Sequence, residues 1–401
     1  MSQADRPNRL LRPQAGATPV TTFELFFDLV YVLAVTQITD LLLGHLTGAG
    51  AVQALILLLA VWWAWMDTAW VTNWFDPDRP PVRLMLIGVM LLSLFMSAVL
   101  PEAYGGQGLA FAGAYAALQV GRTASVWAAL TGQPRLRRNF LRLLAWRSAT
   151  GVLWLAGGLA GGTARMAFWA AAVVVDYVAA AAGFYLPTLG RSGPADWPIS
   201  GRHLAERCRL FLLIALGESI LVAGTNLGRR DPDALSGVAF AVAFAGSVAL
   251  WWIYFDRAAE AAAAVLDAGE EPGRLGRSAY TYHHVPMVAG IIVTAVGDEL
   301  TIDHPLDPAG AAAVATVLGG PALFLLGHVL FKRAVFGRYP AGRLVAAAAL
   351  VVVGVALLAL PAGAAPPLLA LSGYALAALA AAVVLDTRSR TAPAGRSQPA
   401  R

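Results

Sequence analysis

The sequence predicts an all-α polytopic membrane protein of about twelve transmembrane helices, arranged as two parallel six-helix repeats. Three observations lead to this prediction. The chain of 401 residues is 58% hydrophobic and 13% charged, with a mean hydropathy of +0.64, so it holds too few polar residues to cover a water-soluble surface. Its apolar residues gather in long runs, and polar motifs of the first half recur in the second half.

The apolar runs are each about 20 residues long, which is the length that an α-helix needs to cross roughly 30 Å of hydrocarbon. In chain order they cover residues 23–46, 50–71, 83–101, 108–130, 142–160, 165–187, 205–225, 235–256, 279–297, 311–331, 343–360 and 365–385. The first run is too long and too acidic for a cleaved signal peptide, so we expect it to remain as the first helix. The Ala-rich last two runs give the weakest signal.

The distribution of basic residues predicts the orientation, because cytoplasmic loops of membrane proteins are enriched in Lys and Arg. With the N-terminus inside, 24 of the 29 Lys and Arg residues fall at cytoplasmic ends, Arg122 and Arg147 lie within spans, and Arg165, Arg229 and Arg230 fall outside. We therefore expect a multi-pass protein of the cell membrane with both termini cytoplasmic, which requires an even number of helices.

A duplication is indicated by motifs that return in the same order. Glu24 opens the first run and Asp67 closes the second, as Glu206 opens the seventh and Asp256 closes the eighth; Arg122 aligns with His328. Because each half has six helices, both halves insert with the same orientation, and the repeats are parallel. The predicted organisation is a cytoplasmic N-terminal tail (1–20), a first repeat (21–190), a cytoplasmic linker (191–204), a second repeat (205–386) and a disordered cytoplasmic tail (387–401).

Two motifs resemble those of a known family. Residues 24–32 read Glu-Leu-Phe-Phe-Asp-Leu-Val-Tyr-Val, and residues 206–220 read Glu-Arg-Cys-Arg-Leu-Phe-Leu-Leu-Ile-Ala-Leu-Gly-Glu-Ser-Ile. They resemble the hallmark blocks of the bacterial low temperature requirement A (LtrA) membrane proteins, with Tyr31 replacing a Phe. The resemblance covers about residues 20–385. It implies a membrane protein that is named for a cold-growth phenotype and whose biochemical activity is unsettled.

Two acids at the start of the first helix form one candidate site. Glu24 and Asp28 lie one turn apart on one face, so their like charges repel and need a cation, a proton or solvent. Both acids also suit the positive N-terminal end of a helix at a wet interface. The alternative is a cytoplasmic-side gate for a cation or proton, which the two intervening phenylalanines favour because they indicate surrounding protein.

The second helix carries a stripe of tryptophans with Asp67, and Trp252 with Asp256 repeats part of it. An aromatic belt at the membrane interface explains the tryptophans. The two aspartates either accept hydrogen bonds from a neighbouring helix or belong to a binding site.

Three ionisable residues, Arg122, Asp176 and Glu218, fall near the middle of their predicted spans, where charges are costly and commonly functional. We expect Arg122 to neutralise Asp176, which leaves Glu218 free to carry a proton in one shared polar centre. A buried pair that only fixes helix packing is the alternative for Arg122 and Asp176. His283 and His284 begin the ninth helix, where solvated positions are favoured.

Several chemistries lack their sequence signals. There is no Walker-type loop and no Cys or His spacing typical of a metal site, so we expect no cofactor and no resident metal. The basic loops are too short to form a nucleic-acid surface. Ser219 beside Glu218 is a poor nucleophile–base set for an enzyme.

The sequence therefore favours a proton- or cation-coupled secondary transporter of an unknown small solute or cation. The alternatives are a cation channel and a non-transporting membrane protein that supports growth under stress such as cold. The lipid bilayer is the expected partner, and the sequence does not predict the oligomeric state. The candidate residues for substrate or ion binding are Glu24, Asp28, Asp67, Arg122, Asp176, Glu206, Glu218, Asp256 and His328.

Overall fold

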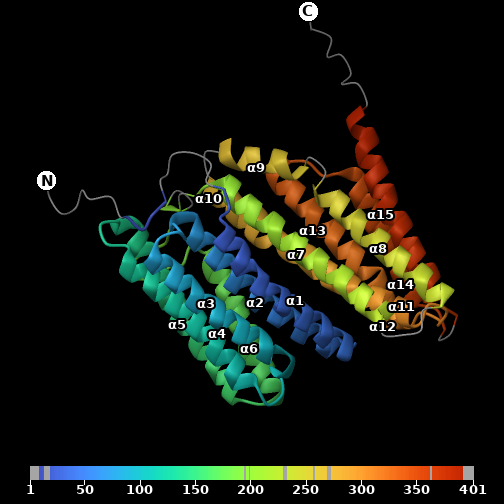
Figure 1. Cartoon of the computed structure of the whole chain (residues 1–401), viewed down its shortest axis with the longest axis horizontal. Helices are drawn as coiled ribbons and strands as arrows, with labels where there is room; N and C mark the ends of the chain where they lie inside the picture. Colours follow the sequence, from blue (N-terminus) through green and yellow to red (C-terminus); the bar gives the residue numbers. More distant parts are fainter. Residues whose placement is uncertain are drawn as a thin grey trace, which may run out of the picture. The chain divides into compact units, whose positions relative to one another are not determined.

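The computed structural model describes residues 9–12, 19–193, 196–197, 199–228, 233–255, 258–268, 272–361 and 364–391. These residues form helices joined by short connections, with isolated β-bridges and no strand (Figure 1). The predicted all-α polytopic class is therefore confirmed. Within the described residues, ten helical segments are long and apolar enough to cross a membrane.

The chain divides into two compact units. Unit 1 comprises Met1–Glu218 with Ala259–Val285, and unit 2 comprises Ser219–Ala258 with Pro286–Arg401. The helices that begin in unit 1 are α1 (Thr22–Gly44), α2 (Gly48–Trp74), α3 (Pro80–Val99), η2 (Leu100–Glu102), α4 (Gly108–Ala129), α5 (Pro134–Leu159), α6 (Gly162–Ala181), α7 (Gly201–Gly228), α10 (Pro272–Leu275), η4 (Gly276–Tyr282) and α11 (His284–Asp303). The remaining helices are α8 (Ala234–Phe255), α9 (Ala258–Ala268), α12 (Ala311–Val317), α13 (Gly319–Phe336), α14 (Ala341–Leu358) and α15 (Leu368–Thr391).

In unit 1, helices α3, α4, α5 and α6 pack in chain order, and α2 packs against α4 and α6 (Figure 1). Small residues allow the closest of these approaches. A Cβ added to Gly158 of α5 would lie 3.0 Å from the Leu109 Cα of α4, so the two backbones meet where a larger residue would separate them. This packing brings the polar faces of α2, α4, α5 and α6 together.

The N-terminal segment is tied to the end of α2. Leu11 forms an isolated bridge with Phe75, and the Arg12 backbone N–H donates to the Trp74 carbonyl at 2.8 Å. The segment therefore lies beside the first turn of α1, where the Arg12 side chain reaches a buried acid described below.

Unit 2 holds α8 and the α11 to α15 region, and α15 packs against both α8 and α14. Glycine again sets a close crossing, because a Cβ on Gly320 would lie 2.5 Å from the Thr294 backbone nitrogen. At the start of α8 the exposed Asp233 carboxylate accepts the Ser236 N–H at 2.7 Å. This cap holds the pKa of the Asp233 carboxyl below its ordinary value and satisfies a donor that the helix leaves open.

Each of the twelve predicted apolar runs coincides with a helical segment. The ten candidate spans leave out α4 and α5, because charged residues such as Arg122, Arg142 and Arg147 interrupt their apolar character. The number twelve and the repeat organisation therefore stay predictions. Helix α15 continues to Thr391, so residues 387–391 of the predicted disordered tail are helical, and residues 392–401 lie outside the described residues.

Candidate functional site

Five charged or titratable side chains form a first buried assembly, here named the Arg207 cluster (Arg12, Glu24, Asp28, His203 and Arg207). Arg207 of α7 serves both acids of α1: its Nη1 lies 3.2 Å from Glu24 Oε1, and its Nη2 lies 2.5 Å from Asp28 Oδ1. His203 Nε2 lies 2.9 Å from Glu24 Oε1, and Arg12 Nη2 donates to Glu24 Oε2 at 2.8 Å. The cation that the two acids need is therefore supplied by the protein itself.

The burial of these acids decides between the two sequence interpretations of their surroundings. Glu24 and Asp28 are 0% and 1% exposed, so the wet-interface interpretation of this pair is wrong. Glu24 still caps its helix, because it forms a reciprocal capping box with Thr21, which stabilises the first turn of α1. The Trp65 indole N–H donates to Asp28 Oδ1 at 2.7 Å. The cluster thus fastens α1 to α2 and α7 through charged hydrogen bonds.

A second buried assembly, the Asp67 network (Asp67, Arg122, Arg147 and Asp176), joins α2, α4, α5 and α6. Asp67 Oδ2 lies 2.9 Å from Arg122 Nη2 and 2.7 Å from Arg147 Nη2. Arg147 Nη1 lies 2.5 Å from Asp176 Oδ1. The four formal charges alternate in sign along this chain of contacts and sum to zero.

Uncharged groups complete the network. Arg122 Nη1 donates to the Ala64 carbonyl at 2.9 Å and to the Thr68 hydroxyl at 3.0 Å, and its Nη2 also contacts Gln119. The Thr150 hydroxyl donates to Asp176 Oδ1 at 2.9 Å. Because desolvated charges are costly unless they are paired and hydrogen-bonded, these contacts offset part of the cost of burying four charged groups in an apolar helix bundle. The Arg147 Nε and Asp176 Oδ2 atoms are buried without a hydrogen-bond partner in the described part of the chain.

The expected Arg122–Asp176 pair is wrong. Asp176 pairs with Arg147, and Arg122 pairs with Asp67. The reason is the hairpin register: α5 and α6 are antiparallel neighbours joined by a short turn, and Arg147 and Asp176 lie at similar distances from that turn. Arg122 stands on α4, on the other side of α5, and reaches α2 instead.

The shared centre with Glu218 is also wrong. Glu218 is buried in α7, where its carboxyl contacts the Thr36 side chain and lies near Asp40, both on α1. It is therefore a neighbour of α1 and stands apart from the contacts of the Asp67 network.

The remaining residues singled out from the sequence belong to neither the Arg207 cluster nor the Asp67 network. Glu206 is half-buried, and the residue that follows it, Arg207, makes the contacts. His328 of unit 2 is fully buried, with Arg343 Nη1 against its ring. Asp256 lies outside the described residues. His284 is buried and stacks on Tyr280 with centroids 5.2 Å apart, so its expected solvated position is wrong.

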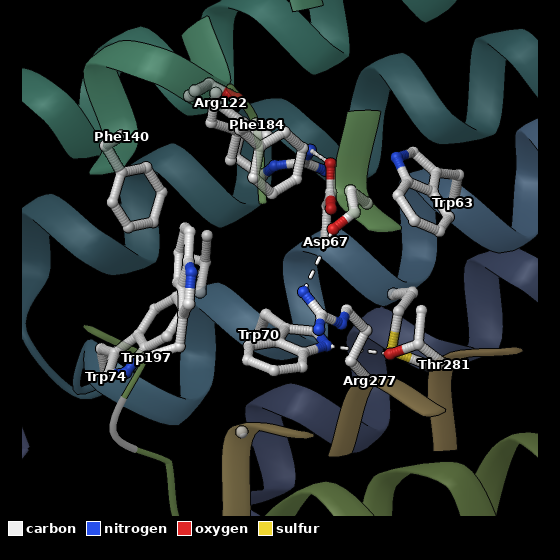
Figure 2. A pocket seen from close by; sticks show the side chains of 16 residues that line it. Trp63, Asp67, Trp70, Trp74, Arg122, Phe140, Phe184, Trp197, Arg277 and Thr281 are labelled. Carbon is white, nitrogen blue, oxygen red and sulfur yellow. Dashed lines mark hydrogen bonds and ion pairs between the residues drawn. The ribbon is translucent and has the colours of Figure 1, made fainter. Parts of the chain in front are cut away.

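An aromatic cavity of about 70 Å³ adjoins the Asp67 network in unit 1. Figure 2 shows Asp67 near the middle of the lining, with Trp74, Trp197 and Phe140 to one side and Arg277 and Thr281 to the other. Asp67 is 15% exposed, whereas the other three members of the network are 1–2% exposed. Asp67 and Arg122 both line the cavity, and Asp67 is the more exposed of the two.

Two irregular segments place side chains in the cavity wall. Phe184, after α6, has φ +53°, a left-handed conformation that is rare for a bulky residue and marks a position held by its surroundings. The π-helix η4 carries Arg277 and Thr281, and π-helical turns recur at functional sites. The Trp70 indole N–H donates to the Thr281 hydroxyl at 3.2 Å, which holds η4 against α2.

Sequence reasoning missed several residues of these assemblies, namely Arg12, Arg147, His203, Arg207 and Arg277. Arg147 carried a signal, because it lies inside an apolar run as Arg122 does. Arg207 carried one as well, because it stands in the second-half motif beside Glu206. The cavity residues Phe184 and Trp197 come from connecting segments, whose positions apolar periodicity does not predict. Arg277 comes from η4, just before the predicted run 279–297.

Comparisons with known proteins agree with the motifs. The family model described as bacterial low temperature requirement A protein (LtrA) matches residues 19–384. A curated relative from Rhizobium meliloti (strain 1021), described as "Uncharacterized protein RA0937", is 36% identical over 334 residues, which cover 83% of this chain and 82% of that protein. No solved structure shows a significant match. The chain therefore belongs to the bacterial low temperature requirement A (LtrA) family.

Proposed function

We propose that this LtrA family protein is a proton- or cation-coupled secondary transporter of a small solute. The observation that carries the proposal is Asp67, which borders the aromatic cavity while its Oδ2 bridges Arg122 and Arg147. Intramembrane ionisable groups that meet a cavity are the usual elements of coupled transport. Neither a nucleotide-binding loop in the sequence nor a group of metal ligands among the described residues offers a different chemistry.

The charge balance of the network explains how binding and coupling are connected. Asp67, Arg122, Arg147 and Asp176 sum to zero, so a proton or cation that reaches Asp67 raises the local charge to +1 and weakens the bridge between α2, α4 and α5. A solute in the cavity contacts the same carboxylate. Occupancy and protonation therefore act on one set of helix contacts, which is what coupling between two ligands requires.

The Arg207 cluster has a different role in this proposal. The two acids of the Arg207 cluster are buried and contact two arginines and a histidine, so the cluster anchors α1 to α7 while the Asp67 network changes. Glu218, with Asp40 nearby on the same side of α1, is a further candidate carrier for a proton.

We also propose the parallel duplication and the cytoplasmic termini. Support for the duplication comes from matching helix contacts. In unit 1, α4 packs on α5, α5 on α6, and α2 on both α4 and α6; in unit 2, α13 packs on α14, α14 on α15, and α8 on both α13 and α15. With the N-terminus inside, the cavity residues Trp74 and Phe140 lie toward the cytoplasmic ends of α2 and α5, so the cavity would load from the cytoplasm.

Replacing Asp67 with Asn is expected to lower coupled flux by about tenfold or more while leaving a folded protein. The reason is that Asn keeps the hydrogen-bonding shape but neither binds a proton nor balances the two arginines. The measurement uses the full-length protein in liposomes with an imposed pH gradient, and follows uptake of small acids, amines and alkali cations.

The matched control is Asp78→Asn, because Asp78 is an exposed acid in the α2–α3 connection. It should leave flux unchanged. Asp67→Glu retains the charge and should keep a measurable part of the flux, which separates loss of coupling from misfolding. If gradient-dependent flux were identical in wild type and Asp67→Asn, the proposed role of Asp67 would be contradicted. If alkali cation flux did not saturate with cation concentration, the protein would be a channel instead.

A further inference from the structure

The charge around the aromatic cavity is positive. Two guanidiniums already contact Asp67, and the Asp67 network as a whole is neutral. Arg277 adds one more positive charge to the cavity lining. Among the described residues it forms no ion pair, and its Nη1 donates to the Ala180 carbonyl at 3.1 Å. The lining thus carries one guanidinium more than its carboxylates balance.

The lining also holds more free donors than free acceptors. Arg277 is half-buried and uses one of its five N–H groups in the Ala180 contact. Guanidinium N–H groups only donate. A ligand that accepts hydrogen bonds would satisfy them, whereas an ammonium ligand would not.

The aromatic rings of the cavity already contact protein groups, so their faces do not favour a cationic ligand. The Trp63 ring already has the Arg147 guanidinium 5.1 Å from its centroid, which is a cation–π contact made by the protein. The rings of Trp74 and Trp197 lie 5.6 Å apart at 35°, and those of Trp74 and Phe140 meet edge to face at 5.6 Å. These rings pack on one another and form an apolar wall.

Size limits the ligand. The cavity volume is about 70 Å³, which is roughly half of the 150 Å³ cavity that holds benzene in an engineered protein core. The cavity therefore has room for a short alkyl chain but not for a whole aromatic ring. A bare halide is disfavoured relative to a carboxylate with a short alkyl chain, because it has no apolar part to bury against the wall.

We propose that the aromatic cavity binds a short-chain monocarboxylate, with the carboxylate on Arg277 and the alkyl chain against the tryptophan wall. The inference rests on the proposed transport function and names its substrate class. A proton at the Asp67 network together with a monocarboxylate in the cavity leaves the local charge unchanged, so the two ligands favour each other's binding.

The test measures binding without transport. Equilibrium dialysis of the purified full-length protein in nanodiscs uses labelled propionate, with propionamide and propylammonium as competitors of similar size. We expect saturable propionate binding that neither competitor displaces. Arg277→Gln should weaken this binding by about tenfold or more, because it removes a charged hydrogen bond, and Arg277→Lys should keep part of it.

The matched control is Arg274→Gln, because Arg274 is an exposed arginine one turn before Arg277 and should leave binding unchanged. Size-exclusion profiles confirm that each variant is folded. The proposal is overturned if propionate does not saturate, if propylammonium displaces it, or if Arg277→Gln binds as tightly as wild type. Coupled flux of another solute with no propionate binding would overturn this inference and leave the proposed function standing.

Discussion

Replacing Arg207 with Ala is expected to reduce the free energy of unfolding by about 3–5 kcal/mol, which is the cost of leaving a buried charge without its partner. Arg207 contacts both Glu24 and Asp28, and all three side chains are at most 2% exposed. His203 and Arg12 remain on Glu24, but the charged partner of Asp28 is lost. We expect the upper end of the range, measured as thermal stability of the purified protein by size-exclusion chromatography.

The control for this change is Arg202→Ala, five residues earlier on α7, where the side chain is exposed. It should change stability by less than about 0.5 kcal/mol. Adding Asp28→Asn to Arg207→Ala should recover part of the loss, because the buried charge disappears with its partner. Equal stability of Arg207→Ala and Arg202→Ala would show that the cluster does not hold α1 to α7.

The second large effect is expected for Arg147→Ala, which should also cost about 3–5 kcal/mol. Arg147 is the charged partner of Asp176 and one of two partners of Asp67. Arg122→Ala should cost less, because Asp67 then keeps Arg147. This order reverses the expectation from sequence, in which Arg122 was the partner of Asp176.

A double-mutant cycle between Arg147 and Asp176 measures the pairing directly. Asp176→Asn in the Arg147→Ala background should be better tolerated than Arg147→Ala alone, which gives a coupling energy of about 1 kcal/mol or more. A larger loss for Arg122→Ala than for Arg147→Ala, or additive effects in the cycle, would mean that the pairing described here does not hold.

The helices were predictable because their signal is local. A run of about 20 apolar residues specifies a spanning helix from its own composition, and each predicted run coincides with a helical segment. The need of Glu24 and Asp28 for a cation was also predictable, because two acids one turn apart repel wherever the helix lies. Their buried partner required tertiary information.

The pairing of charges depends on which helices are neighbours and in which register. Arg122 and Asp176 both fall near the middle of their spans, and depth alone does not distinguish Arg122 from Arg147 as the partner of Asp176. The short turn between α5 and α6 did contain that information, because an antiparallel hairpin brings residues equally far from its turn together. The cavity could not be predicted in this way, since Phe184 and Trp197 reach it from connecting segments and Arg277 reaches it from the π-helix η4.

The central claim is that a solute and a proton or cation are coupled at the Asp67 network, and coupling is reciprocal. The most direct measurement therefore imposes a gradient of propionate across proteoliposomes, with no initial pH gradient, and records the internal pH with a trapped dye. We predict proton movement that follows the propionate gradient, reverses when the gradient is reversed, and is lost in Asp67→Asn. Because propionic acid itself crosses bilayers, the protein-dependent part is the difference from liposomes without protein. The account would be contradicted if proteoliposomes and protein-free liposomes showed the same proton movement, both for propionate and for every other solute that the protein takes up.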